Sequence, residues 1–212
     1  MALPDSATLL IFIAASLALY VSPGPDMIYV LSRSLGQGRR AGLLSCIGIA
    51  MGLLTHMTAA VLGLSTLLEL WPIAYAAVQW LGVAYLLYLG VRTLMGGRAV
   101  ALGAGSAART PAWRLVRQGY LVNLLNPKIA LFFLAFLPQF VDPARGPLAP
   151  QLLTLGLLFN FGGIVWMASL ALLAGGLGDW IAARPRIWAW QRWLTGCALI
   201  GLAAQLAISG RR

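Results

Sequence analysis

Two long apolar segments of this sequence are each interrupted by proline next to an ionisable residue. The first holds Pro23-Gly24-Pro25 followed by Asp26, and the second holds Asn126-Pro127 followed by Lys128. A charge at the bilayer centre costs at least ~2.5 kcal/mol on insertion scales, and broken backbone is tolerated there only where protein or a water-filled cavity covers it. We therefore predict two broken helices whose ionisable residues face the protein interior.

The composition indicates an all-α integral membrane protein. The chain of 212 residues is 60% hydrophobic and only 9% charged, with a mean hydropathy of +0.85. Its apolar runs are long enough to cross the ~30 Å hydrocarbon core of a bilayer, so membrane lipid is their expected surrounding. The net charge of +10 comes from arginines scattered between these runs. We interpret it as a signal of membrane orientation and expect no nucleic-acid partner.

The breakers and charges between the apolar runs define six transmembrane helices and their orientation. The first run lacks a basic start and a cleavage site, so we expect it to be retained rather than removed as a signal peptide. Eleven arginines lie in the first, third and fifth links, against three elsewhere. The positive-inside rule then places these links in the cytoplasm and both termini outside. The predicted spans are about 6–32, 42–68, 73–95, 118–141, 150–174 and 192–209.

The two halves of the chain resemble each other. Residues 1–95 and 118–212 are predicted as three-helix repeats, joined by a cytoplasmic linker at 96–117. The run from Gly52 to His56 parallels the run from Gly156 to Asn160, and the two interruptions also correspond. Three spans in each half make the halves enter the bilayer in opposite senses. This inverted 3+3 repeat, with helices 1 and 4 broken, is the plan of secondary transporters, whose site lies at the repeat interface. The glycine-rich third, fifth and sixth spans would also allow a homodimer.

The interruptions supply the candidate binding site. A half-helix that begins near Asp26 presents free amides, which favour a carboxylate, and Lys128 is a compact cation suited to the same group. Without substrate, we expect Asp26 and Lys128 to pair with each other. The alternatives are a proline kink capped by Asp26 and a lysine that snorkels to the membrane boundary. The predicted substrate-binding residues are Pro23, Gly24, Pro25, Asp26, Asn123, Asn126, Pro127 and Lys128.

Proton coupling is assigned to Asp26 or His56. His56 is the only histidine and lies deep in the second span, and histidine is the side chain that titrates closest to neutrality. The alternative for His56 is a structural hydrogen bond to a backbone carbonyl. We prefer Asp26, because it lies at the break where the substrate is expected. Asn160 is a weaker candidate at the position that corresponds to His56.

The sequence indicates no enzyme, metal centre or cofactor. A single histidine excludes multi-histidine metal sites, and the chain has neither a CxxC motif nor a glycine-rich phosphate loop after a strand. Cys46 and Cys197 lie in apolar sequence and are expected to be free thiols.

These motifs resemble those of the LysE/RhtB amino-acid exporters over nearly the whole chain. The resemblance implies a bacterial inner-membrane exporter of amino acids, driven by the proton gradient, with periplasmic termini. Many members that export basic amino acids carry Asp near the position of Leu53, so this chain looks more like the homoserine/threonine branch. The matching segments are Pro23-Gly24-Pro25, Leu31-Ser32-Arg33-Ser34-Leu35, Gly38-Arg39-Arg40-Ala41-Gly42, Asn123-Leu124-Leu125-Asn126-Pro127-Lys128, Phe132-Phe133 and Leu137-Pro138-Gln139-Phe140.

The sequence therefore favours a secondary-active exporter of small neutral amino acids that works by proton antiport. Export of basic amino acids, or of another small solute or ion, is the alternative. A less favoured hypothesis is a membrane thiol-redox protein that uses Cys46 and Cys197, one cysteine in each half.

Overall fold

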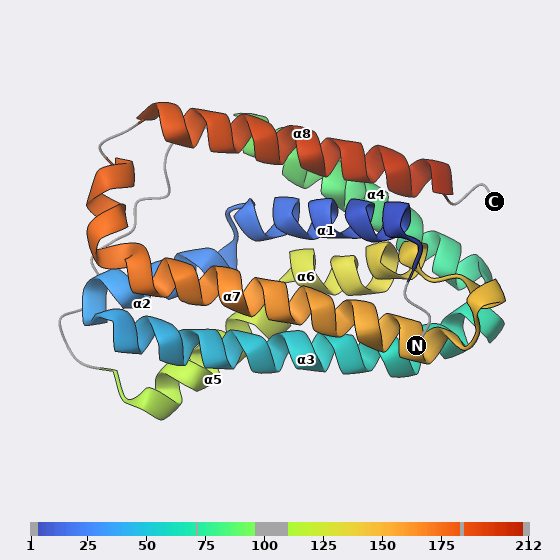
Figure 1. Cartoon of the computed structure of the whole chain (residues 1–212), viewed down its shortest axis with the longest axis horizontal. Coiled ribbons are helices and arrows are strands. Elements are labelled where there is room, and N and C mark those ends of the chain that lie inside the picture. The colour runs from blue at the N-terminus through green and yellow to red at the C-terminus, as the bar shows by residue number, and fades with distance from the viewer. Residues whose placement is uncertain (1–3, 71, 96–109, 183–184, 210–212) are drawn as a thin grey trace.

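The computed structural model describes residues 4–70, 72–95, 110–182 and 185–209, and every regular element within them is a helix (Figure 1). The predicted linker at 96–117 falls largely outside the described residues, and α5 begins at Ala112, within its last part. The elements are α1 (Ser6–Val21), α2 (Pro25–Gln37), α3 (Arg39–Leu70), α4 (Pro72–Met95), α5 (Ala112–Leu124), α6 (Pro127–Leu131), the π-helical turn η1 (Phe132–Phe136), the 3-10 turns η2 (Leu137–Phe140) and η3 (Pro143–Arg145), α7 (Leu148–Ala182) and α8 (Pro185–Ser209).

The helix lengths describe a multi-pass membrane protein. Three stretches of the described chain are long and apolar enough to cross a bilayer: Arg39–Gly63, Ala76–Met95 and Leu148–Ala174. Two bent helix pairs raise the number to five when each pair is counted as one span. The stretch Arg192–Ile208 is apolar but shorter.

The two predicted breaks are confirmed. α1 and α2 meet at an angle of 51°, and α5 meets the segment Pro127–Phe140 at 50°. α1 ends at Val21 because Ser22 precedes a proline and takes extended backbone, with ψ of 118°. Pro25 and Pro127 then begin α2 and α6, at the position where the missing proline N–H costs nothing.

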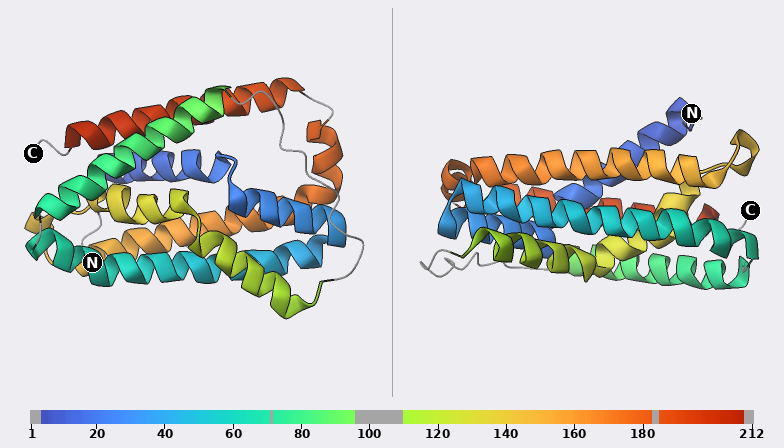
Figure 2. Two further views of the ribbon diagram at one scale, coloured as in Figure 1. Left: turned by 180° about the vertical axis from the view of Figure 1, so that it is seen from behind. Right: turned by 90° about the horizontal axis from the view of Figure 1, so that it is seen from below.

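The helices pack in an order that encloses both breaks. α4 packs along α8, while α3 contacts α2, α5 and α7. Between these groups lie α1, which contacts α7 and α8, and η1, which contacts α3 and α4 (Figures 1 and 2). The start of α1 and the end of α8 lie at one end of the molecule, and the α2–α3 junction lies at the other. The breaks therefore fall in the middle of the structure.

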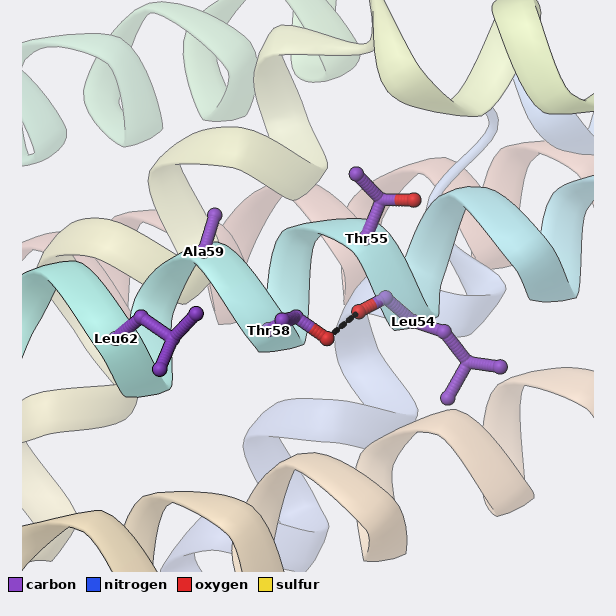
Figure 3. Close-up of a pocket in the computed structure, with 5 residues that line it drawn as sticks. All are labelled: Leu54, Thr55, Thr58, Ala59 and Leu62. Atoms are coloured by element: carbon purple, nitrogen blue, oxygen red, sulfur yellow. Dashed lines mark hydrogen bonds between the residues drawn. The ribbon is translucent and has the colours of Figure 1, made fainter.

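A shallow groove of about 440 Å³ lies along the outer face of α3 (Figure 3). Its two hydroxyl groups already bond to carbonyls of their own helix: Thr55 donates to Met51 at 3.0 Å and Thr58 to Leu54 at 2.8 Å. The groove therefore offers a ligand few free polar groups. Its described lining residues are Leu54, Thr55, Thr58, Ala59 and Leu62.

α3 and α5 approach each other closely through glycine. A Cβ atom on Gly48 would clash with the carbonyl oxygen of Val116 and the amide nitrogen of Tyr120, both backbone atoms of α5. A Cβ atom on Gly119 of α5 would in turn clash with the carbonyl oxygen of Ser45 on α3 and lie 3.4 Å from Cα of Gly48. The backbones can pack this closely only because both positions lack a side chain, as in other small-residue contacts between membrane helices.

We predict that Gly48→Ala destabilises the protein by about 1–3 kcal/mol, the usual cost of overpacking. The matched control is Gly63→Ala in the same helix, where a Cβ would meet no atom within 4 Å. That control should gain up to about 1 kcal/mol from helix propensity. Thermal unfolding in detergent measures both. Equal stability of the two variants would contradict the close packing of α3 on α5.

Candidate functional site

The carboxylate of Asp26 crosses from the first break to the second. Asp26 lies in the first turn of α2 and is 4% exposed. Its Oδ2 accepts hydrogen bonds from Nδ2 of Asn123 at 3.0 Å and from Nδ2 of Asn126 at 2.9 Å. Asn126 is also the cap of α6, where its Oδ1 accepts from the amide of Lys128 at 3.1 Å. The second break therefore holds the carboxylate of the first.

The ammonium of Lys128 crosses in the opposite direction. Lys128 is 8% exposed, and its Nζ donates to the carbonyl oxygens of Leu19 at 3.1 Å and Ser22 at 3.0 Å. These carbonyls lie at the C-terminal end of α1, the negative end of its dipole, where the break leaves acceptors without helical donors. The same Nζ lies beside Gly24, where a Cβ atom would be only 3.0 Å from it.

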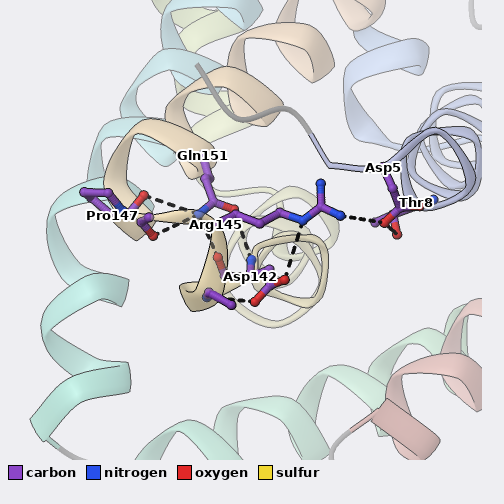
Figure 4. Close-up of polar contacts among 8 residues, drawn as sticks. Asp5, Thr8, Asp142, Arg145, Pro147 and Gln151 are labelled. Carbon is purple, nitrogen blue, oxygen red and sulfur yellow. Dashed lines mark hydrogen bonds and ion pairs between the residues drawn. The ribbon is translucent and has the colours of Figure 1, made fainter.

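The expected direct pairing of Asp26 with Lys128 is wrong for this structure. The ion pairs among the described residues join Arg145 to Asp5 and to Asp142, each at 3.5 Å, at the outer end of the molecule (Figure 4). Each buried charge is stabilised instead by polar groups of the opposite break. Snorkelling of Lys128 is also wrong, because the ammonium bonds to buried backbone and not to the membrane boundary.

Several polar groups at the breaks lack a hydrogen-bond partner among the described residues. Oδ1 of Asp26 and Oδ1 of Asn123 are buried and accept no hydrogen bond from the described part of the chain. Gly24 caps α2 without a side chain, so the first amides of this helix have no side-chain acceptor there. One side of the site thus offers acceptors for an ammonium group. The other side offers a helix N-terminus and Lys128 for a carboxylate.

His56 is connected to Asp26 through Asn123. Nε2 of His56 lies 3.2 Å from the carbonyl oxygen of Asn123, whose side chain bonds to Asp26. The imidazole stacks on Phe133, with ring centroids 6.2 Å apart and planes at 10°. His56 therefore makes the backbone contact that a structural histidine would make. The residue it contacts, Asn123, is the one whose side chain bonds to Asp26. Asn160 lies deeper among apolar groups, with Nδ2 3.7 Å from Sδ of Met57.

The predicted site residues thus lie together at the two breaks, with Pro23 between α1 and α2. The two cysteines lie on different helices, Cys46 buried on α3 and Cys197 exposed on α8, and both are free thiols. This arrangement gives no support to a thiol relay.

Sequence reasoning missed two parts of this region. It gave no role to the carbonyls of Leu19 and Ser22, because every residue carries a carbonyl and no residue type marks them. It also missed a row of polar contacts between α2 and α5. The four-residue spacing of Tyr29, Arg33 and Gln37 along one helix face was the available signal.

Two broken helices that exchange buried ionisable residues, within a bundle of apolar helices, define a membrane transport protein rather than an enzyme. The family of LysE type translocators matches residues 17–210, so the chain belongs to this family.

Related proteins cover most of the chain. An uncharacterized membrane protein of Pseudomonas aeruginosa is 30% identical over 189 residues, covering 87% of this chain and 88% of its own. Leucine efflux proteins of Salmonella choleraesuis and Klebsiella pneumoniae are 26% and 27% identical, and each alignment covers 92% or 93% of both chains. No solved structure matches the chain.

Proposed function

We propose that this protein exports small neutral amino acids across the bacterial inner membrane by proton antiport. The observation that carries the proposal is the pair of opposite charges that the two breaks hold across from each other. A zwitterion presents the complementary pair. In this proposal the chain forms six spans as an inverted repeat, with the arginine-rich links in the cytoplasm and both termini in the periplasm.

In the proposed complex, the substrate bridges the two sides of the site. Its ammonium bonds to the free Oδ1 of Asp26 and to Oδ1 of Asn123, and its carboxylate lies between Lys128 and the start of α2 at Gly24. The substrate would then supply the partners that these buried groups lack, so binding costs little desolvation beyond that of the substrate itself.

A neutral side chain is favoured over a basic one. A basic side chain would need a further carboxylate near the site, and the other carboxylates with described side chains, Asp5 and Asp142, both contact Arg145 at the outer end (Figure 4). Apolar groups surround the His56 side of the site, including Phe133 and the buried Leu53. The leucine efflux proteins among the relatives support the same choice. We therefore include aliphatic as well as hydroxylated amino acids in the substrate class.

We predict that Asp26→Asn and Lys128→Met each lower export by about thirtyfold or more, because truncating one partner of a buried charged contact costs about 2–5 kcal/mol. Efflux of labelled amino acids from loaded cells measures the loss. The matched control is Asp5→Asn, which keeps a good helix cap at the outer end of α1 and should export normally. Normal efflux from both site variants, at normal protein levels in the membrane, would contradict the proposal.

Asp26 is the proposed coupling group because substrate and proton would compete for one atom. Its Oδ2 is already occupied by two amides, while Oδ1 is free to hold either a proton or the substrate ammonium. Mutual exclusion at Oδ1 is what an antiporter requires. His56 lies next to Asn123 and would act on this exchange only indirectly.

We predict that Asp26→Asn loses transport driven by a pH gradient, whereas His56→Gln keeps it, because only the aspartate touches the substrate. Proteoliposomes with and without a pH gradient measure driven transport, and exchange of labelled for unlabelled substrate serves as the control for binding. The preference for Asp26 is refuted if His56→Gln alone loses the driven mode but keeps exchange, while Asp26→Asn keeps both.

A further inference from the structure

A row of polar side chains runs along one face of α2, from the site to the end of the helix. Asp26, Tyr29, Arg33 and Gln37 are spaced by three or four residues, so they lie one above the other on the same face. All four contact α5 or the residues that flank it. The row extends from the polar site toward the arginine-rich end of the molecule.

Hydrogen bonds close this row along its whole length. Oη of Tyr29 donates to the carbonyl oxygen of Leu115 at 2.9 Å, and Arg33 donates to Oε1 of Gln118 at 3.0 Å. At the C-terminal end of α2, Nε2 of Gln37 donates to Oγ1 of Thr110 at 3.0 Å, and the amide of Thr110 donates to Oε1 of Gln37 at 2.9 Å. We call these contacts the α2–α5 seam: Tyr29, Arg33 and Gln37 on one side, and Thr110, Leu115 and Gln118 on the other.

Arg33 gives the seam a polarity that suits a zwitterion. Its guanidinium lies 5.3 Å from the centre of the Tyr29 ring and bonds only to uncharged oxygens, those of Gln118 and Thr110. No carboxylate with a described side chain lies within ion-pair distance of it. Arg33 is a half-buried cation seven residues, or about two helical turns, from Asp26. It can therefore bind the carboxylate of an amino acid before the ammonium group reaches Asp26.

We propose that the α2–α5 seam is the route by which the substrate reaches Asp26 from the arginine-rich end, and that its hydrogen bonds hold this route shut in the present structure. The inference rests on the proposed function for the identity of the substrate. The opening itself does not, and can be measured without any substrate. Arg33 meets the substrate carboxylate first, when the seam opens and its bond to Gln118 is released.

The opening is measured with a reporter cysteine at Leu115→Cys, in a background of Cys46→Ala and Cys197→Ser. Leu115 is 2% exposed, at the centre of the seam. We expect Gln37→Ala with Thr110→Ala to raise its rate of labelling by a membrane-impermeant maleimide about tenfold, because the closed state loses the hydrogen bonds between Gln37 and Thr110. The increase should occur in inside-out vesicles and not in right-side-out vesicles.

The matched control is Leu152→Cys on α7, which is fully buried but lies away from the seam. Its labelling should stay unchanged in the same Gln37→Ala, Thr110→Ala background. An unchanged rate at Leu115→Cys, or an equal increase at Leu152→Cys, would overturn the proposal. Failure of amino-acid export with the expected labelling would instead refute the proposed function and leave the opening of the seam intact.

A second experiment joins Gln37 and Thr110 covalently, so that the seam cannot open at this contact. In the background of Cys46→Ala and Cys197→Ser, Gln37→Cys with Thr110→Cys is joined by a short bifunctional methanethiosulfonate, which forms a disulfide with each thiol and releases sulfinate. The cross-link should stop exchange of the transported amino acid, and a thiol reductant that cleaves both disulfides should restore it. The single-cysteine variants treated in the same way are the controls. Full exchange by the cross-linked protein would show that the seam need not open, which overturns the proposal even if the alanine variants fail to insert.

Discussion

The structure depends on how a carboxylate and an ammonium are stabilised in the middle of an apolar bundle. Neither charge is solvated, and a direct ion pair would not satisfy their remaining hydrogen-bonding groups. The chain solves this by breaking two helices at the same depth. Each break exposes polar groups that a continuous helix would use internally, and each stabilises the charge of the other: two asparagines bind Asp26, and two carbonyls bind Lys128. The two halves are thereby coupled through their breaks.

This coupling has a consequence for transport. A group bound to Oδ1 of Asp26 shares this carboxylate with both breaks, because Asn126 links Oδ2 of Asp26 to the amide of Lys128 at the start of α6. The two half-helices meet at nearly the same angle at both breaks, 51° at the first and 50° at the second. In the proposed mechanism, binding at the site moves α2 relative to α5 and opens the seam. The outer end is joined differently, by Arg145 between Asp5 and Asp142 (Figure 4).

Much of this arrangement could be predicted from the sequence. Proline lacks the N–H that a helix interior needs and clashes with the preceding turn, so Pro23, Pro25 and Pro127 indicated where the helices break. Asn123 and Asn126 were predicted, together with Asp26, as substrate-binding residues. The partners of Lys128 could not be predicted, because they are backbone carbonyls. The expected pairing of Asp26 with Lys128 failed for the same reason: the end of α1 supplied acceptors that residue types do not reveal. Arg33 was counted among the charges that orient the protein in the membrane and within a family motif, and its contacts with α5 needed the structure.

In the proposed mechanism, the site recognises both charges of a neutral amino acid. The most direct test is the affinity of the purified protein for the neutral amino acid that it transports best, compared with two analogues. One analogue is the amide, which lacks the carboxylate, and the other is the deaminated acid, which lacks the ammonium. We predict that each analogue binds at least about tenfold more weakly, a loss of ~1.4 kcal/mol or more, because each leaves one side of the site without its partner. Binding of either analogue as tight as that of the amino acid would contradict this account.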